Sequence, residues 1–327
     1  MDEYLIYRFP GESVQYFLGR WEKTTLQNVL DQTGRFVVST DDGKEVFAFV
    51  SEVKIEREGF HPQLKNKSDQ IAVSQEDYSI ALAEVLKEME GDIQKTVFSR
   101  IDRRHWDATG ILEVFDALEE AYPNTLVYIL VSGQWGTWLG ATPETLLASS
   151  VDHFNSMALA GTLPANTTED WTEKEREEQA YVEKYILEAI QEEGSLLQQS
   201  EVEERFAGPV KHLCTRFQFV LKDGRLEPFI RRLHPTPAVC GIPLEEARAL
   251  YRKYEKHQRK LYTGFIGRVG REKFNLFVNL RCMECYIDSV DLYVGGGITK
   301  DSVPGKEWEE TVRKANTLGQ FLSKHER

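Results

Sequence analysis

Two carboxylates and an ammonium group are spaced along the last amphipathic segment so that one helical face would carry all three. Glu307, Glu310 and Lys314 stand at positions i, i+3 and i+7, and residues with this spacing share a face. The same stripe continues into Leu318 and Phe321, which are typical of a hydrophobic core. Because buried charge is costly unless it is paired or bound to a metal, this face predicts a functional site.

A glycine run precedes this predicted helix. An apolar strand over residues 290–294 leads into Gly295, Gly296 and Gly297, and a polar turn with Pro304 follows before the helix. Glycine allows backbone amides to approach an anion closely. We therefore expect the run to line a carboxylate or phosphate site.

A third carboxylate lies on the packing face of another predicted helix, the long one over residues 172–193. Glu178, Val182, Tyr185 and Ala189 follow one another at i, i+4, i+7 and i+11. Buried carboxylates on two separate helices suggest a shared cation. Ligation by oxygen alone, without His or Cys, favours a hard ion such as Mg²⁺.

Three other charged residues stand in apolar surroundings. Lys95 opens a strand predicted over residues 95–101, Glu144 follows a Thr-Pro turn, and Arg281 lies in an apolar, strand-like segment over residues 277–283. A guanidinium is out of place in such a segment unless it binds an anion.

Each of these residues also has a purely structural explanation. Lys95 could extend to solvent from the end of its strand, and Glu144 could cap a neighbouring helix. Arg281 could neutralise Glu284 or Asp288. The residues alone leave these alternatives open.

Length, composition and charge limit the class of protein. A chain of 327 residues can bury a sizeable core. A formal net charge of -13 argues against nucleic-acid and anionic-membrane partners. No apolar run reaches the roughly 20 residues of a membrane helix, and the acidic amino terminus lacks the pattern of a signal peptide. We expect a cytoplasmic enzyme.

The cysteines do not form a convincing metal or redox motif. Cys282 and Cys285 are the only close pair among the four cysteines. Their segment is expected to be a strand, in which positions three apart face opposite sides. We therefore expect free buried thiols.

The order of elements favours an α+β fold with antiparallel sheet. Short apolar runs separated by turn signals fill residues 1–55, a polar connection follows over 56–70, and helices alternate irregularly with strands afterwards. No linker divides the chain. We expect a single domain over residues 1–327, with an amino-terminal strand region (1–70) and a catalytic core (71–322).

A series of motifs in one fixed order covers about residues 70–322. In these motifs the chain resembles the chorismate-utilising enzymes, and among them most closely the isochorismate synthases. The resemblance implies a large antiparallel β-sandwich flanked by helices. The motifs are Lys95-Thr-Val-Phe-Ser-Arg100, Leu139-Gly-Ala-Thr-Pro-Glu144, Leu159-Ala-Gly-Thr162, Lys174-Glu-Arg-Glu-Glu178, His212-Leu-Cys-Thr215, Leu233-His-Pro-Thr-Pro-Ala-Val-Cys-Gly241, Tyr262-Thr-Gly264, Arg281, Gly295-Gly-Gly-Ile298 and Glu307-Trp-Glu-Glu-Thr-Val-Arg-Lys314.

The resemblance implies roles for the charged residues. Lys95 matches the base that activates water for attack on ring carbon 2 of chorismate, and Glu144 matches the acid that protonates the departing 4-hydroxyl group. Glu178 and Glu310 match the Mg²⁺ ligands, with Glu307 near enough to assist. A lysine base must be neutral and the glutamic acid protonated, which a dry pocket favours.

The resemblance also implies how the substrate is held. The metal would bind the ring carboxylate, and Arg281 would bind the enolpyruvyl carboxylate. The remaining positions that the resemblance assigns to substrate binding are Lys314, Gly296, Gly297, Tyr262, Thr162, Thr215 and Ala238.

Three positions indicate which activity within the family is expected. Lys95 favours water as nucleophile, because ammonia-using members carry glutamine there, and no glutamine amidotransferase subunit is expected. Ala160 replaces the lysine nucleophile of aminodeoxychorismate synthases. Ala238 resembles the synthases that stop at isochorismate, whereas salicylate-forming relatives tend to carry threonine.

We therefore expect a Mg²⁺-dependent isochorismate synthase that acts on chorismate. Menaquinone synthesis is the first expectation for its pathway and siderophore synthesis the second. A salicylate-forming enzyme, or a non-catalytic chorismate-binding protein, is the alternative.

The chain departs from the family pattern at three places. Gln179 stands where the family usually has histidine, so a contact to the metal ligand Glu178 is in doubt. Gly296 replaces a common alanine in what is expected to be a glycine turn, and the amino-terminal region is shorter than in many relatives.

Overall fold

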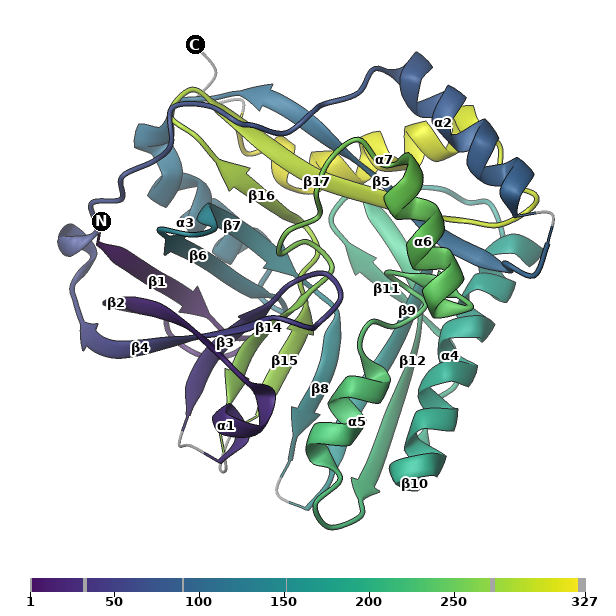
Figure 1. The fold of residues 1–327 in the computed structure, drawn as a ribbon, viewed down its shortest axis with the longest axis horizontal. Coiled ribbons are helices and arrows are strands. Elements are labelled where there is room, and N and C mark those ends of the chain that lie inside the picture. Colours follow the sequence, from purple (N-terminus) through teal and green to yellow (C-terminus); the bar gives the residue numbers. More distant parts are fainter. Residues whose placement is uncertain (1, 32–33, 90, 151, 271–273, 323–327) are drawn as a thin grey trace.

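Strands form the centre of the molecule and helices cover its outside (Figure 1). The structure, a computed structural model, describes residues 2–31, 34–89, 91–150, 152–270 and 274–322. The strands are β1 (Glu3–Arg8), β2 (Gln15–Thr24), β3 (Arg35–Ser39), β4 (Val46–Lys54), β5 (Lys95–His105), β6 (Leu126–Ser132), β7 (Gly136–Thr142), β8 (Thr145–Ser149), β9 (Phe154–Pro164), β10 (Gly194–Gln199), β11 (Glu203–Ala207), β12 (Val210–Leu221), β13 (Gly241–Ile242), β14 (Phe265–Val269), β15 (Asn275–Val278), β16 (Cys282–Cys285) and β17 (Ser289–Ile298). The α-helices are α1 (Leu26–Leu30), α2 (Gln75–Glu88), α3 (Ile111–Ala121), α4 (Glu173–Glu193), α5 (Leu226–Leu233), α6 (Leu244–Tyr254) and α7 (Pro304–Gly319).

The strands pair in one continuous antiparallel ladder. Its order is β13–β5–β17–β16–β7–β6–β1–β2–β4–β3–β14–β15–β8–β9–β12, and β10 and β11 both pair with the far side of β12. Strands β1 to β4 stand in the middle of this order. The amino-terminal strands therefore join the two halves of the sheet.

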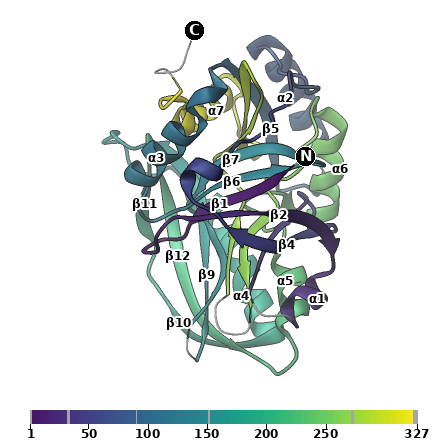
Figure 2. The ribbon, with the colours of Figure 1, turned by 90° about the vertical axis from the view of Figure 1, so that its left-hand side faces the viewer.

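The ladder folds over so that its two halves enclose a shared core. Side chains from both halves meet there, among them Phe47, Trp138 and Phe277. Helices α3 and α7 pack on the outer face of one half, and α4 and α5 on the outer face of the other. Figure 2 shows the two helical layers on opposite sides of the strands. The predicted antiparallel β-sandwich flanked by helices is confirmed.

Local sequence signals explain where the main helices begin. Ser74 caps α2 by accepting a hydrogen bond from the amide of Asp77. Thr172 and Glu175 form a capping box at the start of α4. Pro304 occupies the first turn of α7, where its missing N–H costs nothing. Helices α4 and α7 begin within a residue or so of the positions predicted from the sequence.

Two expectations about strands were wrong. The glycine run is not a turn, because Gly295, Gly296 and Gly297 continue β17 and pair with β5. Arg281 is not inside a strand either. It lies between β15 and β16 with a positive φ of 48°, a conformation that non-glycine residues rarely adopt.

The cysteines behave as expected. All four are free and buried. Within β16, Cys282 belongs to the shared core and Cys285 to the cluster under α3 and α7. The two thiols therefore lie on opposite faces of the sheet and cannot bind one metal together.

The helices also bear on the question of a membrane. In the part of the chain that the structure describes, no helix combines the length and the apolar character needed to cross a bilayer.

Candidate active site

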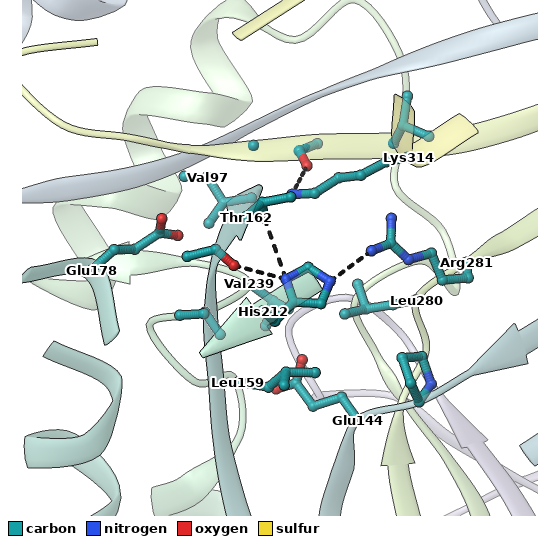
Figure 3. Close-up of a pocket in the computed structure, with 18 of the residues that line it drawn as sticks. Val97, Glu144, Leu159, Thr162, Glu178, His212, Val239, Leu280, Arg281 and Lys314 are labelled. Atoms are coloured by element: carbon teal, nitrogen blue, oxygen red, sulfur yellow. Dashed lines mark hydrogen bonds between the residues drawn. The ribbon is translucent and has the colours of Figure 1, made fainter. Parts of the chain in front are cut away.

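A small cavity lies where the two halves of the sandwich meet beside α4 and α7. Its volume is about 60 Å³, and Figure 3 shows it with Glu178 on one side, Arg281 on the other and Glu144 near His212. The structure places nine of the predicted site residues in its wall. They are Glu144, Thr162, Glu178, Ala238, Tyr262, Arg281, Gly296, Gly297 and Lys314.

One end of the cavity, which we call the carboxylate end, gathers Glu178 with Glu307 and Glu310 from α7. Each of these acids lies against a lysine. The pairs are Lys95 Nζ with Glu178 Oε1 at 2.9 Å, Lys174 Nζ with Glu307 Oε1 at 2.5 Å, and Lys314 Nζ with Glu310 Oε1 at 2.7 Å. Three carboxylates are thus balanced by three ammonium groups.

The glycines of β17 make room for these carboxylates. A Cβ on Gly297 would lie 2.2 Å from Glu178 Oε1, and one on Gly296 would lie 3.3 Å from Glu307 Oε2. The first distance is far inside van der Waals contact. The glycine run therefore brings the acidic side chains against the strand backbone from both faces.

The same stretch of β17 presents backbone groups to the cavity. Beyond Tyr293 no second strand covers β17 among the described residues. Val97, which stands opposite Gly297, donates its amide hydrogen to the carbonyl of Cys240 and not to β17. Val97 and Gly297 therefore form a non-hydrogen-bonded pair of the antiparallel ladder, in which both amides point away from the partner strand. The Gly297 amide thus points away from β5. Lys314 Nζ donates to the carbonyl of Gly295 at 2.9 Å.

The two glutamates of α7 at the carboxylate end have pKa values shifted in opposite directions. Burial and the neighbouring charge of Glu310 raise the pKa of Glu307. Burial alone would raise the pKa of Glu310 as well, but Lys314 and Lys174 outweigh it and lower the value. Burial would lower the pKa of Lys174, yet the carboxylates of Glu307, Glu310 and Glu178 raise it well above its usual range.

The donor chemistry of this end fits a hard divalent cation. Its acidic ligands are all carboxylate oxygens, and Oε2 of Glu307 is buried without a hydrogen-bond partner in the described structure. The acids are not yet arranged as a ligand shell, because no group of three or more His, Cys, Asp or Glu side chains within the described ranges is close enough to hold a metal. Each acid is instead paired with a lysine.

The opposite end, which we call the arginine end, is built around Arg281 and His212. Arg281 Nη2 lies 2.9 Å from His212 Nε2. His212 Nδ1 lies 2.8 Å from the carbonyl oxygen of Gly161, so Nδ1 carries the proton and Nε2 accepts from the guanidinium. Burial, and then the charge of Arg281, lower the pKa of His212 to about 3, which keeps the ring neutral.

Arg281 has no carboxylate partner in the described part of the chain. Neither Glu284 nor Asp288 pairs with it, since Glu284 binds Lys260 and Asp288 accepts from Ser289. The alternative that Arg281 neutralises one of these acids is therefore wrong. Its positive charge faces the cavity.

Glu144 is a buried acid with no hydrogen-bond partner for its carboxyl group among the described residues. It stands between β7 and β8 with 2% of its surface exposed and caps no helix. Burial raises its pKa to about 8, although the charge of Lys95 opposes the shift. At neutral pH this carboxyl group is therefore mostly protonated.

Lys95 does not reach the solvent as the structural alternative required. It is fully buried at the start of β5. Its Nζ lies near Glu178 without a well-aligned hydrogen bond. The side chain also passes close to Gly297, 3.0 Å from where a Cβ would stand, so Lys95 lies directly behind the cavity wall.

Thr215 is the predicted substrate contact that the structure does not bring to the cavity. Its hydroxyl accepts from Gln179 Nε2 at 3.1 Å and donates to Glu183 at 2.8 Å. Gln179 also accepts from the amide of Ala160. Gln179 and Thr215 thus attach α4 to β9 and β12, and Gln179 supports the helix that carries Glu178.

Sequence reasoning missed two residues of the site, His212 and Lys174. Lys174 precedes Glu178 by four positions, a spacing that places it on the same helical face, so periodicity could have revealed it. His212 lies within a continuous run of buried residues at the start of β12. Nothing local distinguishes it from a core histidine, because its partner Arg281 is 69 residues away.

Comparisons with known proteins agree with this geometry. The family model of chorismate binding enzymes matches residues 15–323. Isochorismate synthase EntC of Escherichia coli (strain K12) is 29% identical over 251 residues, which cover 71% of this chain and 63% of EntC. Isochorismate synthase MenF of Pasteurella multocida is 27% identical over 258 residues, covering 72% of this chain and 59% of MenF. The chain thus spans less than two thirds of the length of these relatives.

A solved structure supports the fold over nearly the whole chain. The menaquinone-specific isochorismate synthase MenF from Escherichia coli superimposes with a TM-score of 0.79 at 20% sequence identity, covering 98% of this chain and 88% of that one.

Proposed function

The chain belongs to the chorismate binding enzyme family, and we propose that it is an isochorismate synthase, an isomerase that converts chorismate to isochorismate with Mg²⁺ as cofactor. The observation that carries the proposal is the division of one cavity into an end that suits a metal and an end that suits an anion. Residues 1–327 would act as one catalytic domain, because β1 to β4 are built into the middle of the sheet.

The arginine end would hold the enolpyruvyl carboxylate of chorismate. Arg281 offers a guanidinium that pairs with no carboxylate within the described ranges, and the neutral His212 fixes its orientation. Tyr262 lines the same wall with its phenol group. Burial of an anion beside an uncompensated guanidinium is favourable where burial of either charge alone is not.

The carboxylate end would hold the metal through Glu178 and Glu310, with Glu307 assisting. A bound Mg²⁺ would fix the ring carboxylate of the substrate and neutralise its charge. The Gly297 amide and Lys314 would contact the same carboxylate, whereas the amide of Gly296 belongs to the pairing with β5. Lys174 would have to leave Glu307 for the acids to converge.

Glu144 and Lys95 would perform the proton transfers. Glu144 is protonated at neutral pH and faces the cavity, so it can protonate the departing 4-hydroxyl group. Lys95, as the base, would take a proton from the water that attacks carbon 2. Its Nζ lies 2.9 Å from Glu178 Oε1 in the structure, so Lys95 has to leave that partner before it can act on the water.

A product assay tests the proposal. Protein, chorismate and MgCl₂ are incubated and the products separated by chromatography. Isochorismate supports the proposal. Salicylate with pyruvate would instead assign a salicylate-forming enzyme. Ala238 in the cavity wall argues against that alternative, because salicylate-forming relatives tend to carry threonine there. Binding without any product would indicate a non-catalytic chorismate-binding protein.

The biological setting is also part of the proposal. We expect a cytoplasmic enzyme of menaquinone synthesis that needs no glutamine amidotransferase subunit, because Lys95 suits water as the nucleophile. Siderophore synthesis is the alternative. Deletion of the gene in its own host distinguishes the two pathways: loss of menaquinone with unchanged siderophore production would assign the first, and the reverse result the second.

A further inference from the structure

A second, much larger cavity adjoins the candidate active site. Its volume is about 890 Å³, and its wall includes the segment after α3 (residues 121–125) and strand β11. Figure 2 shows α3 and β11 on the same side of the molecule. Pro143 and Arg281 line both cavities, so they form the partition between them. We call this larger cavity the vestibule.

The inner cavity is too small for its proposed substrate as it stands. Ligand pockets usually measure about 300–1,000 Å³, whereas the inner cavity measures about 60 Å³. A substrate therefore has to displace side chains as it enters. The shared wall at Arg281 is where the larger space meets the smaller one.

The vestibule carries an excess of positive charge. Its two lining acids are already paired, Glu203 with Arg216 and Glu204 with Lys211. Arg205 and Arg281 have no carboxylate partner in the described ranges. This local excess stands out in a chain whose formal net charge is -13, because the rest of the surface repels an anion.

Arg205 is placed to pass an anion toward Arg281. It stands directly opposite His212 in the pairing of β11 with β12, and residues opposite each other in a sheet point to the same face. His212 in turn holds Arg281. Among the described residues the guanidinium of Arg205 contacts weak sulfur acceptors, Met157 Sδ at 3.1 Å from Nη1 and the thiol of Cys214, which a carboxylate replaces readily.

We propose that the vestibule is the access route for the dianionic substrate and that Arg205 binds one of its carboxylates on the way to Arg281. Arg205 is then an outer anion-binding position. It accelerates capture of the substrate and takes no part in the chemical step. This inference rests on the proposed function for the identity of the ligand, a small dicarboxylate.

The test measures the association rate constant of chorismate by rapid mixing in the presence of MgCl₂, at low and at high ionic strength. Arg205→Gln is expected to lower this rate constant about tenfold at low salt, with little change in kcat, because electrostatic steering acts on encounter. The difference should shrink at high salt, where charges are screened.

Two further variants test whether the effect depends on the charge of the vestibule. Glu203→Gln leaves Arg216 without its partner and should raise the association rate constant about threefold, the opposite direction. Arg20→Gln makes the same change in net charge as Arg205→Gln at an exposed site in β2, where Arg20 pairs with Glu22, and should leave the rate unchanged.

The outcomes separate this inference from the proposed function. Failure of the unaltered protein to bind chorismate would overturn the proposed function. Normal binding with the same association rate in all three variants would overturn the access route alone. A fall in kcat without a change in association rate would place Arg205 in the bound complex and overturn its role in access as well.

Discussion

In the part of the chain that the structure describes, each of three acids at the carboxylate end of the cavity lies against a lysine, whereas Arg281 and Glu144 at the arginine end have no oppositely charged partner. Each end combines buried with partly buried side chains, so the difference is not one of exposure. It reflects two ways of avoiding the cost of isolated charge. Acids and lysines neutralise one another at the first end, and at the second Glu144 takes up a proton while Arg281 is held by a neutral histidine.

The comparison indicates what each end requires of a ligand. A cation can enter the carboxylate end only by displacing ammonium groups, so its binding is an exchange of partners. An anion that enters the arginine end meets the guanidinium of Arg281, which no carboxylate of the described residues neutralises and whose orientation His212 already fixes. The arginine end is prepared in advance, and the carboxylate end has to rearrange.

The largest effect on turnover is expected from substitution of Lys95. Its ion pair with Glu178 either has a purely structural role or is the arrangement of the catalytic base before substrate binds. Lys95→Ala should lower kcat by about 10²- to 10⁴-fold, the usual contribution of a general base, with a smaller change in substrate affinity. Steady-state kinetics measures both. Lys184→Ala, at an exposed position of α4, is the control, and near-normal turnover by Lys95→Ala would show that the pairing is only structural.

Glu144 tests whether the unpaired acid is kept protonated. Glu144→Gln should lower kcat by about 10²-fold or more. In the unaltered protein kcat/KM should fall as pH rises through about 8, because the pKa of Glu144 is raised to about 8 and only the protonated form can donate.

The same pKa has a consequence for stability. Because the pKa of Glu144 is higher in the folded than in the unfolded protein, the contribution of Glu144 to the free energy of unfolding is complete below the unfolded pKa of about 4.3. This contribution is lost as pH rises through the folded pKa of about 8. Glu144→Gln should therefore lose less thermal stability than the unaltered protein between about pH 5 and about pH 9. Equal losses in the two proteins would mean that Glu144 is ionised throughout.

Removal of one metal ligand tests the exchange at the carboxylate end. Glu310→Ala should raise the Mg²⁺ concentration needed for half-maximal activity at least about tenfold, and chelation should abolish the activity of the unaltered enzyme reversibly. Calorimetric titration with MgCl₂ provides a reading independent of turnover. Glu309→Ala, on the exposed face of the same helix, is the matched control, and equal Mg²⁺ dependence in the two variants would exclude Glu310 as a ligand.

His212 tests whether the arginine end is prepared in advance. His212→Ala should raise KM for chorismate about tenfold and lower kcat less, because a hydrogen bond to a charged group contributes about 1.5–3 kcal/mol. His212→Gln, whose amide oxygen can accept from Arg281, should recover part of the loss. A fall confined to kcat would contradict a positioning role.

The smallest effect on activity is expected at Thr215, which holds α4 and lies outside the cavity wall. Thr215→Val should change kcat and KM by less than about threefold but lower the free energy of unfolding by about 1–3 kcal/mol, because the buried amide of Gln179 and the part-buried carboxylate of Glu183 each lose a hydrogen bond. Denaturant unfolding measures the loss. A large rise in KM with unchanged stability would return Thr215 to the substrate site.

Short-range patterns were sufficient for much of the architecture. Helix caps such as Ser74 and Thr172 act within one turn, so the starts of α2 and α4 could be predicted. The in-stripe positions of Glu178, Glu307 and Glu310 also follow from helical period alone. Patterns of this kind do not show which strands become neighbours, so the continuous ladder and the central place of β1 to β4 were not predictable.

The site shows the same division. The sequence by itself determined which helical faces carry buried carboxylates and that glycines stand beside them, because period and residue size are local properties. Only the tertiary structure decided that Gly297 in β17 makes room for Glu178 from α4, that Arg281 lies between two strands beside His212, and that Thr215 supports α4. These outcomes depend on contacts between residues far apart in the chain, whose geometry is set by packing of the whole sandwich and by no single segment.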